Sequence, residues 1–151
     1  MDTRPFNDHS FASFLSEKQL MGSRCGGCQR LFVPPRAMCP ACHGADLEWE
    51  RLPETGKLVA CTHMTLVAPD LAEQGYGRDN PCCVGVVELQ AHVRIVARLE
   101  QTDRLGRLPI PVGLPVRVLF PEHEPSTEKP ATHTHPVLVC VPDTASDAQR
   151  D

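Results

Sequence analysis

The apolar residues near the start of the chain recur at helical spacing. In the segment FNDHSFASFLSEKQL this apolar set comprises Phe11, Phe14, Leu15 and Leu20. Asn7 or Asp8 can serve as the N-cap, and Gly22 is expected to end the helix. The pattern therefore predicts an amphipathic helix over residues 6–20, which either packs on its own protein or docks on a partner.

From Gly56 onward the pattern changes to the period of two that is typical of β-strands. It predicts strands over residues 56–68, 82–89, 92–99, 116–120 and 137–141. The apolar side of the first strand comprises Leu58, Ala60, Met64, Leu66 and Ala68. The connection PDLAEQGYGRDNP between the first two strands is long and rich in turn formers, as functional loops often are. Short strands separated by turns predict a small Greek-key barrel.

A cysteine-rich stretch separates the predicted helix from the predicted barrel. The fold class is therefore mostly β, with an N-terminal helix, a four-cysteine ribbon and a five-stranded barrel. The expected parts are an N-terminal helix over 1–22, a ribbon over 23–52, a barrel domain over 53–142 and a flexible tail over 143–151.

The ribbon contains two Cys-x-x-Cys pairs separated by ten residues. A two-residue gap lets both thiolates of a pair reach one ion, and zinc binds four thiolates in a tetrahedron. The insert QRLFVPPRAM is long enough to run out and back. We therefore expect one structural Zn²⁺ per chain, with iron in the same cage, disulfides or metal-free thiols as alternatives. The expected ligands are Cys25, Cys28, Cys39 and Cys42.

A four-cysteine site has no open coordination position, so its expected role is folding rather than catalysis. Cysteines in the predicted strands are interpreted as small hydrophobes; they are Cys61, Cys82, Cys83 and Cys140. A catalytic thiolate among them needs a neighbouring histidine, for which His63 and His92 are the candidates. His43 is interpreted as a surface residue of its knuckle. The polar stretch 122–135 is interpreted as a solvated loop rather than a second metal site.

Composition and charge argue against several classes of function. The formal charge is −4, and residues 56–141 contain one Tyr, one Phe and no Trp, whereas nucleic-acid-binding barrels use basic grooves and stacking aromatics. No apolar run approaches the roughly 20 residues that span a bilayer. The first twenty residues lack the apolar core of a signal peptide. We therefore expect a cytoplasmic protein that binds neither nucleic acid nor a membrane.

The stretch CGGCQRLFVPPRAMCPACHGADLEWERLPETGKL, with the strand leading to Ala68-Pro69, resembles the DUF35 family. Its specific features are Pro-Pro-Arg at 34–36, Leu-Glu-Trp at 47–49 and Gly56. The segments NPCCVGVVELQAHVRIVARL and VGLPVRVLF resemble the family's central hairpin and penultimate strand. Departures occur at Gln90-Ala91 and at 81–83. The resemblance implies a rubredoxin-like zinc ribbon joined to an OB-fold domain over about residues 6–141.

The resemblance also implies a small, non-catalytic subunit that bridges thiolase-like and synthase-like catalytic subunits in an acyltransferase complex. Acetyl transfer to a phloroglucinol-type acceptor is one branch of that function, and acyl-CoA is a candidate ligand. An accessory acyl-CoA-binding subunit of a MaoC-like hydratase is the alternative, and a nucleic-acid-binding ribbon and barrel is a third. In the first interpretation the catalytic residues belong to the partner, so the isolated chain is expected to be inactive.

Partner contact is expected at the loop from Pro69 to Pro81, together with the N-terminal helix and the edge of the ribbon. Tyr and Arg are frequent interface anchors, and a ribbon is too small to bury all of its apolar side chains. The expected contact residues are Phe32, Leu71, Tyr76 and Arg78. The alternative is that Leu71 and Tyr76 cap the core of the barrel itself.

Overall fold

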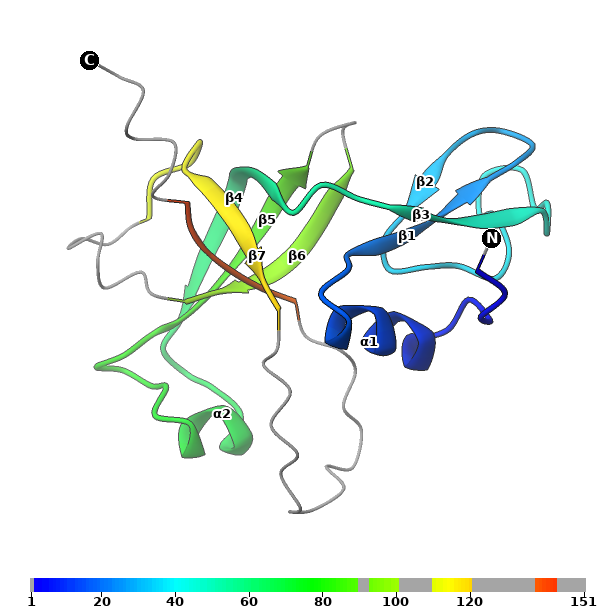
Figure 1. Ribbon diagram of the computed structural model, residues 1–151. Coiled ribbons are helices and arrows are strands. Elements are labelled where there is room, and N and C mark those ends of the chain that lie inside the picture. The colour runs from blue at the N-terminus through cyan, green and yellow to red at the C-terminus, as the bar shows by residue number, and fades with distance from the viewer. Residues whose placement is uncertain (1, 90–92, 101–109, 121–137, 144–151) are drawn as a thin grey trace. The chain divides into compact units, whose positions relative to one another are not determined.

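The computed structural model describes residues 2–89, 93–100, 110–120 and 138–143. The chain forms two compact units. Of the described residues, the first comprises 2–54 and Phe120, and the second comprises 55–89, 93–100, 110–119 and 138–143. Figure 1 shows the elements of both units, coloured by residue number. The architecture is mostly β, as the sequence predicts.

In the first unit, helix α1 (Asp8–Ser16) begins at Asn7, whose side chain accepts a hydrogen bond from the backbone N–H of Ser10 at 2.9 Å. This confirms one of the two predicted caps. The buried face of the helix comprises Ser10, Phe11, Phe14 and Leu15. Because this apolar face is already buried, the structure favours a helix that packs on its own protein over one that docks on a partner.

The helix ends earlier than predicted. Lys18 donates its backbone N–H to the carbonyl of Leu15 at 3.0 Å, and Gln19 donates to Phe14 at 2.9 Å. These paired bonds form a Schellman motif around Lys18, which is left-handed at φ 58. Gly22, the predicted stop, lies instead in a strand, where an added Cβ would approach the carbonyl oxygen of Phe32 to 2.8 Å. Close strand contact, and not a helix end, requires this glycine.

The ribbon is a three-stranded antiparallel sheet in the order β2 (Leu31–Phe32), β1 (Met21–Cys25) and β3 (Leu47–Arg51). Trp49 of β3 joins this sheet to the N-terminal segment. Its ring lies 4.8 Å, between centroids, from both Phe6 and Phe14, and its Nε1 donates to the carbonyl of Arg4 at 2.9 Å. The helix and the residues before it are therefore part of the ribbon unit.

The second unit is a closed barrel in the order β4-β5-β6-β8-β7, with β7 returning to β4. Its strands are β4 (Thr55–Met64), β5 (Cys82–Leu89), β6 (Arg94–Leu99), β7 (Pro115–Leu119) and β8 (Val139–Pro142). All pairings are antiparallel except that of β6 with β8. This is the topology of a five-stranded OB-fold, so the predicted fold class is confirmed. The buried core includes Leu58, Val87, Ile95, Val116 and Val141.

The predicted first strand is confirmed as far as Met64, but its predicted apolar face is wrong beyond Leu58. Its pairing with β5 shifts between Leu58 and Ala60, which is a β-bulge at Val59. A bulge exchanges the two faces, so Leu58 is buried while Ala60 is exposed. The strand then ends at Met64, and Leu66, predicted to face inward, is 93% exposed.

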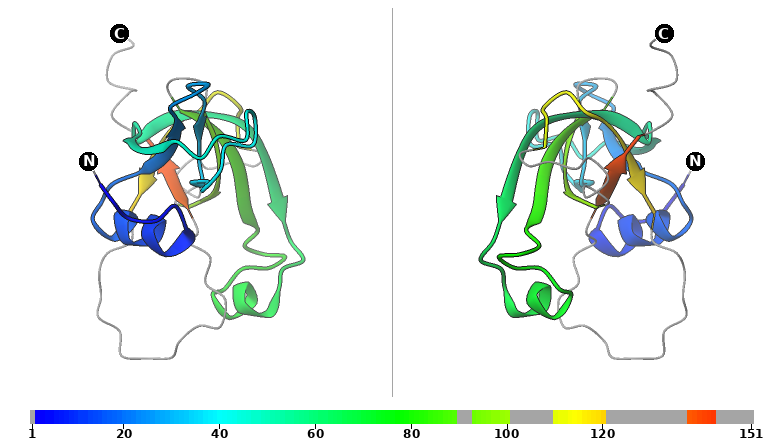
Figure 2. Two further views of the ribbon diagram at one scale, coloured as in Figure 1. Left: turned by 90° about the vertical axis from the view of Figure 1, so that its right-hand side faces the viewer. Right: turned by 90° about the vertical axis from the view of Figure 1, so that its left-hand side faces the viewer.

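The long connection between β4 and β5 contains a short helix, α2 (Pro69–Glu73), where the sequence predicts only a loop. Pro69 starts it, as proline commonly does at the first helical position. Figure 2 shows α2 at the far end of the hairpin formed by β4 and β5. The turn at Gln90-Ala91, the stretch 122–135 and most of the tail lie outside the described residues.

Candidate metal centre

The thiols of the two Cys-x-x-Cys pairs converge on one point in the first unit. Their Sγ atoms all lie within 4.8 Å of one another, and both the Cys25–Cys42 and the Cys28–Cys39 distances are 3.5 Å. Sulfurs around one tetrahedral zinc lie about 3.8 Å apart, given a Zn–S bond of about 2.3 Å. A disulfide needs about 2.05 Å. The spacing therefore fits a four-thiolate metal cage and does not fit disulfides.

The two knuckles repeat one backbone turn. In each, the carbonyl of the first cysteine accepts the N–H of the residue four positions later, at 2.9 Å for Cys25 and 2.8 Å for Cys39. The first cysteine also donates its own N–H to the carbonyl five positions later, at 2.9 Å in both knuckles. Gln29 and His43 occupy equivalent left-handed positions, at φ 63 and 60. His43 is exposed and shapes this turn, as expected for a knuckle-surface residue.

The second knuckle favours a thiolate at its buried sulfur. Burial opposes ionisation of Cys39, but backbone N–H groups of the knuckle, that of Cys42 foremost, lower the pKa of Cys39 to about 6. At Cys42 the N–H of Gly44 also favours the thiolate, yet the neighbouring thiols outweigh it and raise the pKa of Cys42 to about 11. Thiolate is the form that binds a metal. The cage therefore supplies both the sulfur geometry and part of the charge that a metal ion requires.

The cage rests on a small apolar cluster. Cys25, Cys39 and Leu47 are buried together, and the side chains packed against them are Phe6, Cys28 and Phe32. The sequence predicts Phe32 at an exposed partner surface, but the side chain is half-buried and packs beside the cage. A ribbon this small has few other apolar side chains that can cover its cysteine sulfurs, so the Phe32 ring packs against them and not into solvent.

Two family profiles match the chain. One, described as "ChsH2, rubredoxin-like zinc ribbon domain", matches residues 13–48, and the other, "ChsH2, C-terminal OB-fold domain", matches residues 49–121. A DUF35 domain-containing scaffold protein from Methanocaldococcus jannaschii is 26% identical over 80 residues, which are 53% of this chain and 54% of that protein. The chain belongs to the DUF35 family. It spans about half the length of that curated relative.

Two solved DUF35 structures share the fold. The chain superposes on the structure titled "Ltp2-ChsH2(DUF35) aldolase" with a TM-score of 0.64 and 22% identity, covering 94% of this chain and 98% of that one. A DUF35 protein of unknown function from Sulfolobus solfataricus gives a TM-score of 0.57 and 17% identity, covering 89% and 84%. At these identities the likeness shows the fold alone.

The remaining cysteines of this DUF35 chain lie in the barrel. Cys82, Cys83 and Cys140 are buried and Cys61 is half-buried. Burial raises the pKa of Cys82 and of Cys61, and it raises the pKa of Cys140 to about 12. Thiols with raised pKa values stay protonated at neutral pH and pack as small hydrophobes.

His63 is one of the two histidines that the sequence offers as neighbours of a strand cysteine, but the sequence does not say which cysteine it faces. The register of β4 with β5 sets His63 opposite Cys83. The His63 Nε2 is buried and has no hydrogen-bond partner among the described residues, while Cys83 is only 3% exposed. This burial keeps the sulfur from a substrate. The β-bulge at Val59 determines the pairing, and the apolar pattern of the sequence does not reveal that bulge.

The loop expected to contact a partner is partly used by the barrel itself. Arg98 stacks on the Tyr76 ring at 5.7 Å, and its Nη1 donates to the side chain of Gln74 at 3.4 Å. Tyr76 and Leu71 are half-buried, whereas Arg78 is exposed. The structure therefore places Tyr76 against Arg98 of the barrel and leaves Arg78 and Leu66 as the more accessible groups.

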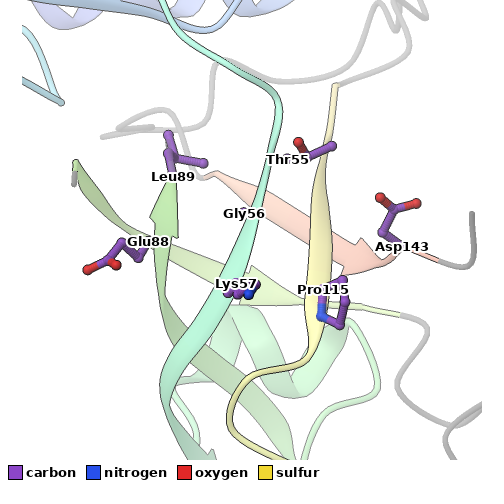
Figure 3. A pocket seen from close by; sticks show the side chains of 7 residues that line it. All are labelled: Thr55, Gly56, Lys57, Glu88, Leu89, Pro115 and Asp143. Atoms are coloured by element: carbon purple, nitrogen blue, oxygen red, sulfur yellow. The ribbon is translucent and has the colours of Figure 1, made fainter. Parts of the chain in front are cut away.

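The barrel also carries a hollow of about 390 Å³, lined by Thr55, Gly56, Lys57, Glu88, Leu89, Pro115 and Asp143. Figure 3 shows these side chains on β4, β5 and β7 and just beyond β8. Glu88 forms an ion pair with Arg94 at 3.0 Å. The lining mixes an ammonium group with carboxylates, so its charge selects no single class of ligand.

Within the described residues, no helix is long and apolar enough to cross a membrane.

Proposed function

We propose that this chain is a non-catalytic scaffold subunit of a hetero-oligomeric enzyme, whose partner subunits supply the catalytic groups. The observation that supports it most is the combination of a closed four-thiol cage and an OB barrel in a DUF35 chain, together with a curated relative named a scaffold protein. In the described residues, the thiols lie either in this cage or within the barrel, where most are buried. Such groups suit stability better than turnover.

The proposal includes one structural Zn²⁺ per chain, with Cys25, Cys28, Cys39 and Cys42 as its ligands. The soft, four-sulfur donor set and the spacing of the sulfurs support zinc. With all positions filled by thiolates, the ion supplies cross-linking of the two knuckles and no site for substrate. The ribbon buries too few apolar groups to hold this shape by packing alone.

For the partner, we propose catalytic subunits of the thiolase and synthase type, in the cytoplasm, that transfer an acyl group from acyl-CoA. A phloroglucinol-type acceptor is one candidate. A second candidate chemistry is aldol cleavage, because the solved neighbour with 98% coverage is titled an aldolase. Both chemistries leave the same role to this chain, namely to hold the catalytic subunits.

The proposed contact surface is the segment from Leu66 to Arg78, with Leu71 on α2 and Tyr76 as its internal anchor. Leu66 is 93% exposed, and an apolar side chain so exposed beside a surface helix is typical of an interaction site. Arg78 is exposed at the other end of the same loop. The loop folds back on Arg98, so its shape is set before a partner binds.

The test is affinity purification of the tagged chain from its native host, followed by mass identification and assay of the partner. A stoichiometric thiolase-type or aldolase-type subunit supports the proposal and decides between the two chemistries. Leu66→Ser with Arg78→Ala should then weaken assembly at least tenfold, while Val112→Ser, which removes another exposed apolar side chain, should not. Recovery of the folded, zinc-loaded chain as a monomer without such a partner would contradict the proposal.

A further inference from the structure

The two knuckles of the cage differ in how they are held. Both have the same backbone turn, but the first knuckle is also tied to its neighbours by side chains. The guanidinium of Arg24, one residue before Cys25, donates from Nη1 to the carbonyl of Gln29 at 2.7 Å. The same guanidinium donates from Nη2 to Glu50 of β3 at 2.6 Å and from Nε to the other carboxylate oxygen.

Three contacts of one planar group thus connect the knuckle to the sheet. Gln29 is the left-handed residue that closes the first knuckle, so a hydrogen bond that fixes its carbonyl oxygen also fixes the shape of that turn. Its side chain also donates to the carbonyl of Gly26 at 2.8 Å, and the N–H of Gly26 donates to the carbonyl of Asp46 at 2.8 Å. Arg24 is the one side chain in this set that links the knuckle, β1 and β3 together.

The electrostatics agree with a persistent contact. The hydrogen bond from Arg24 lowers the pKa of Glu50, and the same bond raises the pKa of Arg24. Both side chains remain about one-third exposed, at 32% and 37%, so the pair is not a major source of folding energy. A planar guanidinium that donates several hydrogen bonds at a partly exposed site fixes the geometry of its neighbours more than it adds to the free energy of folding.

The second knuckle has no equivalent side-chain fork among the described residues. The segment that leads into this knuckle is held by Ser23. The buried Oγ of Ser23 accepts a hydrogen bond at 2.9 Å from the backbone N–H of Arg36, three residues before Cys39. Cys42 is exposed. The first knuckle is therefore the more preorganised half of the cage, and the second is the half that has freedom to open.

We infer that Arg24 is a positioning residue for the metal centre: by holding Gln29 and Glu50 together it keeps the first knuckle in ligand geometry and slows release of the ion. This rests on the proposed metal site. Groups that orient metal ligands without touching the ion typically change metal affinity about 10- to 100-fold when removed. Lysine at this position can pair with Glu50 but cannot present the same planar fork to both acceptors.

The experiment uses the full chain loaded with Zn²⁺ and measures the rate at which a colorimetric chelator removes the ion. Arg24→Gln should release zinc at least tenfold faster, and Arg24→Lys should restore the native rate only in part. The matched control is Arg51→Gln, which breaks an ion pair of 3.1 Å with Glu54 in the same unit but away from the cage. Its release rate should stay within about twofold of the native one.

Two further measurements separate positioning from stability. Unfolding rates of each loaded variant are followed by circular dichroism, and Co²⁺-loaded proteins are compared by their thiolate charge-transfer bands. Faster zinc release without faster unfolding, with a shifted Co²⁺ spectrum in Arg24→Gln, is the expected result. Native release in Arg24→Gln, or release that rises only in step with unfolding, overturns the inference. Failure of the unmodified chain to bind Zn²⁺ or Co²⁺ instead overturns the proposed metal site.

Discussion

The ring of Trp49 in β3 stacks on Phe6 of the N-terminal segment, with 4.8 Å between centroids and 27° between planes. Trp49→Ala should therefore release both this segment and α1 from the ribbon. We expect a loss of about 3 kcal/mol in the stability of that unit, at the low end for large aromatic truncations because the ring is half-exposed. Circular dichroism melts measure it. Met38→Ala is the control, since Met38 is 58% exposed in the same unit and should change stability by less than about 0.5 kcal/mol.

Removal of the metal should unfold the ribbon and leave the barrel folded, because the cage and the barrel core belong to different units. Trp49 is the single tryptophan of the chain, so its fluorescence reports the ribbon unit alone. Chelation, or any of the serine variants of Cys25, Cys28, Cys39 and Cys42, should shift Trp49 emission to longer wavelength. Cys61→Ser lies outside the cage and should leave the emission unchanged. Unshifted emission in a metal-free, folded protein would refute the structural role of the ion.

Gly56 should tolerate no side chain. A Cβ there would lie 2.4 Å from the backbone carbonyl oxygen of Glu88, so β4 and β5 would have to separate. Gly56→Ala is expected to cost the barrel about 2 kcal/mol or more. At Gly77 nothing lies within 4 Å of an added Cβ, so Gly77→Ala should be close to neutral. Equal melting temperatures for the two variants would show that this contact is not rigid.

The barrel should lose stability at alkaline pH through Cys140. Burial raises its pKa from the ordinary 9.0 to about 12. The pKa of this thiol is higher in the folded state than in the unfolded state. Its contribution to the free energy of unfolding is therefore complete below about pH 9, and it falls by up to about 1.4 kcal/mol per pH unit as the pH rises from 9 towards 12. Cys140→Ala should be less stable at pH 7.5 but should show a shallower decline between pH 9 and 10.5. Parallel stability curves would contradict this account.

Most strands, the closed barrel and the convergence of the four cysteine sulfurs could be predicted, because each depends on local periodicity or on the reach of a Cys-x-x-Cys knuckle. The cysteine motif places both thiols of a knuckle on one point whatever surrounds it. The face of β4 beyond Leu58 could not be predicted, since one inserted residue at Val59 inverts it. His63 could be named as a candidate neighbour of a cysteine, but its pairing with Cys83 in particular depends on the same bulge and could not be predicted.

Other departures arise where tertiary contacts override local signals. Gly22 reads as a helix stop, yet close strand packing requires it, while Lys18 takes the left-handed position usually given to glycine. The sequence predicts Phe32 as an exposed anchor for a partner, but its ring packs against the cluster formed by the cage cysteines. A Phe32→Ser variant should therefore reduce zinc retention as well as assembly, and it cannot test partner contact by itself.

The most direct test of the scaffold proposal is the turnover of its catalytic partner, purified and assayed with and without this chain. The account predicts that the chain alone is inactive, that the partner alone is inactive or unstable, and that adding the zinc-loaded chain restores turnover at a fixed subunit ratio. Chain carrying Cys25→Ser should fail to restore it. A partner that is fully active and stable without the chain, or turnover by the chain alone, would contradict the account.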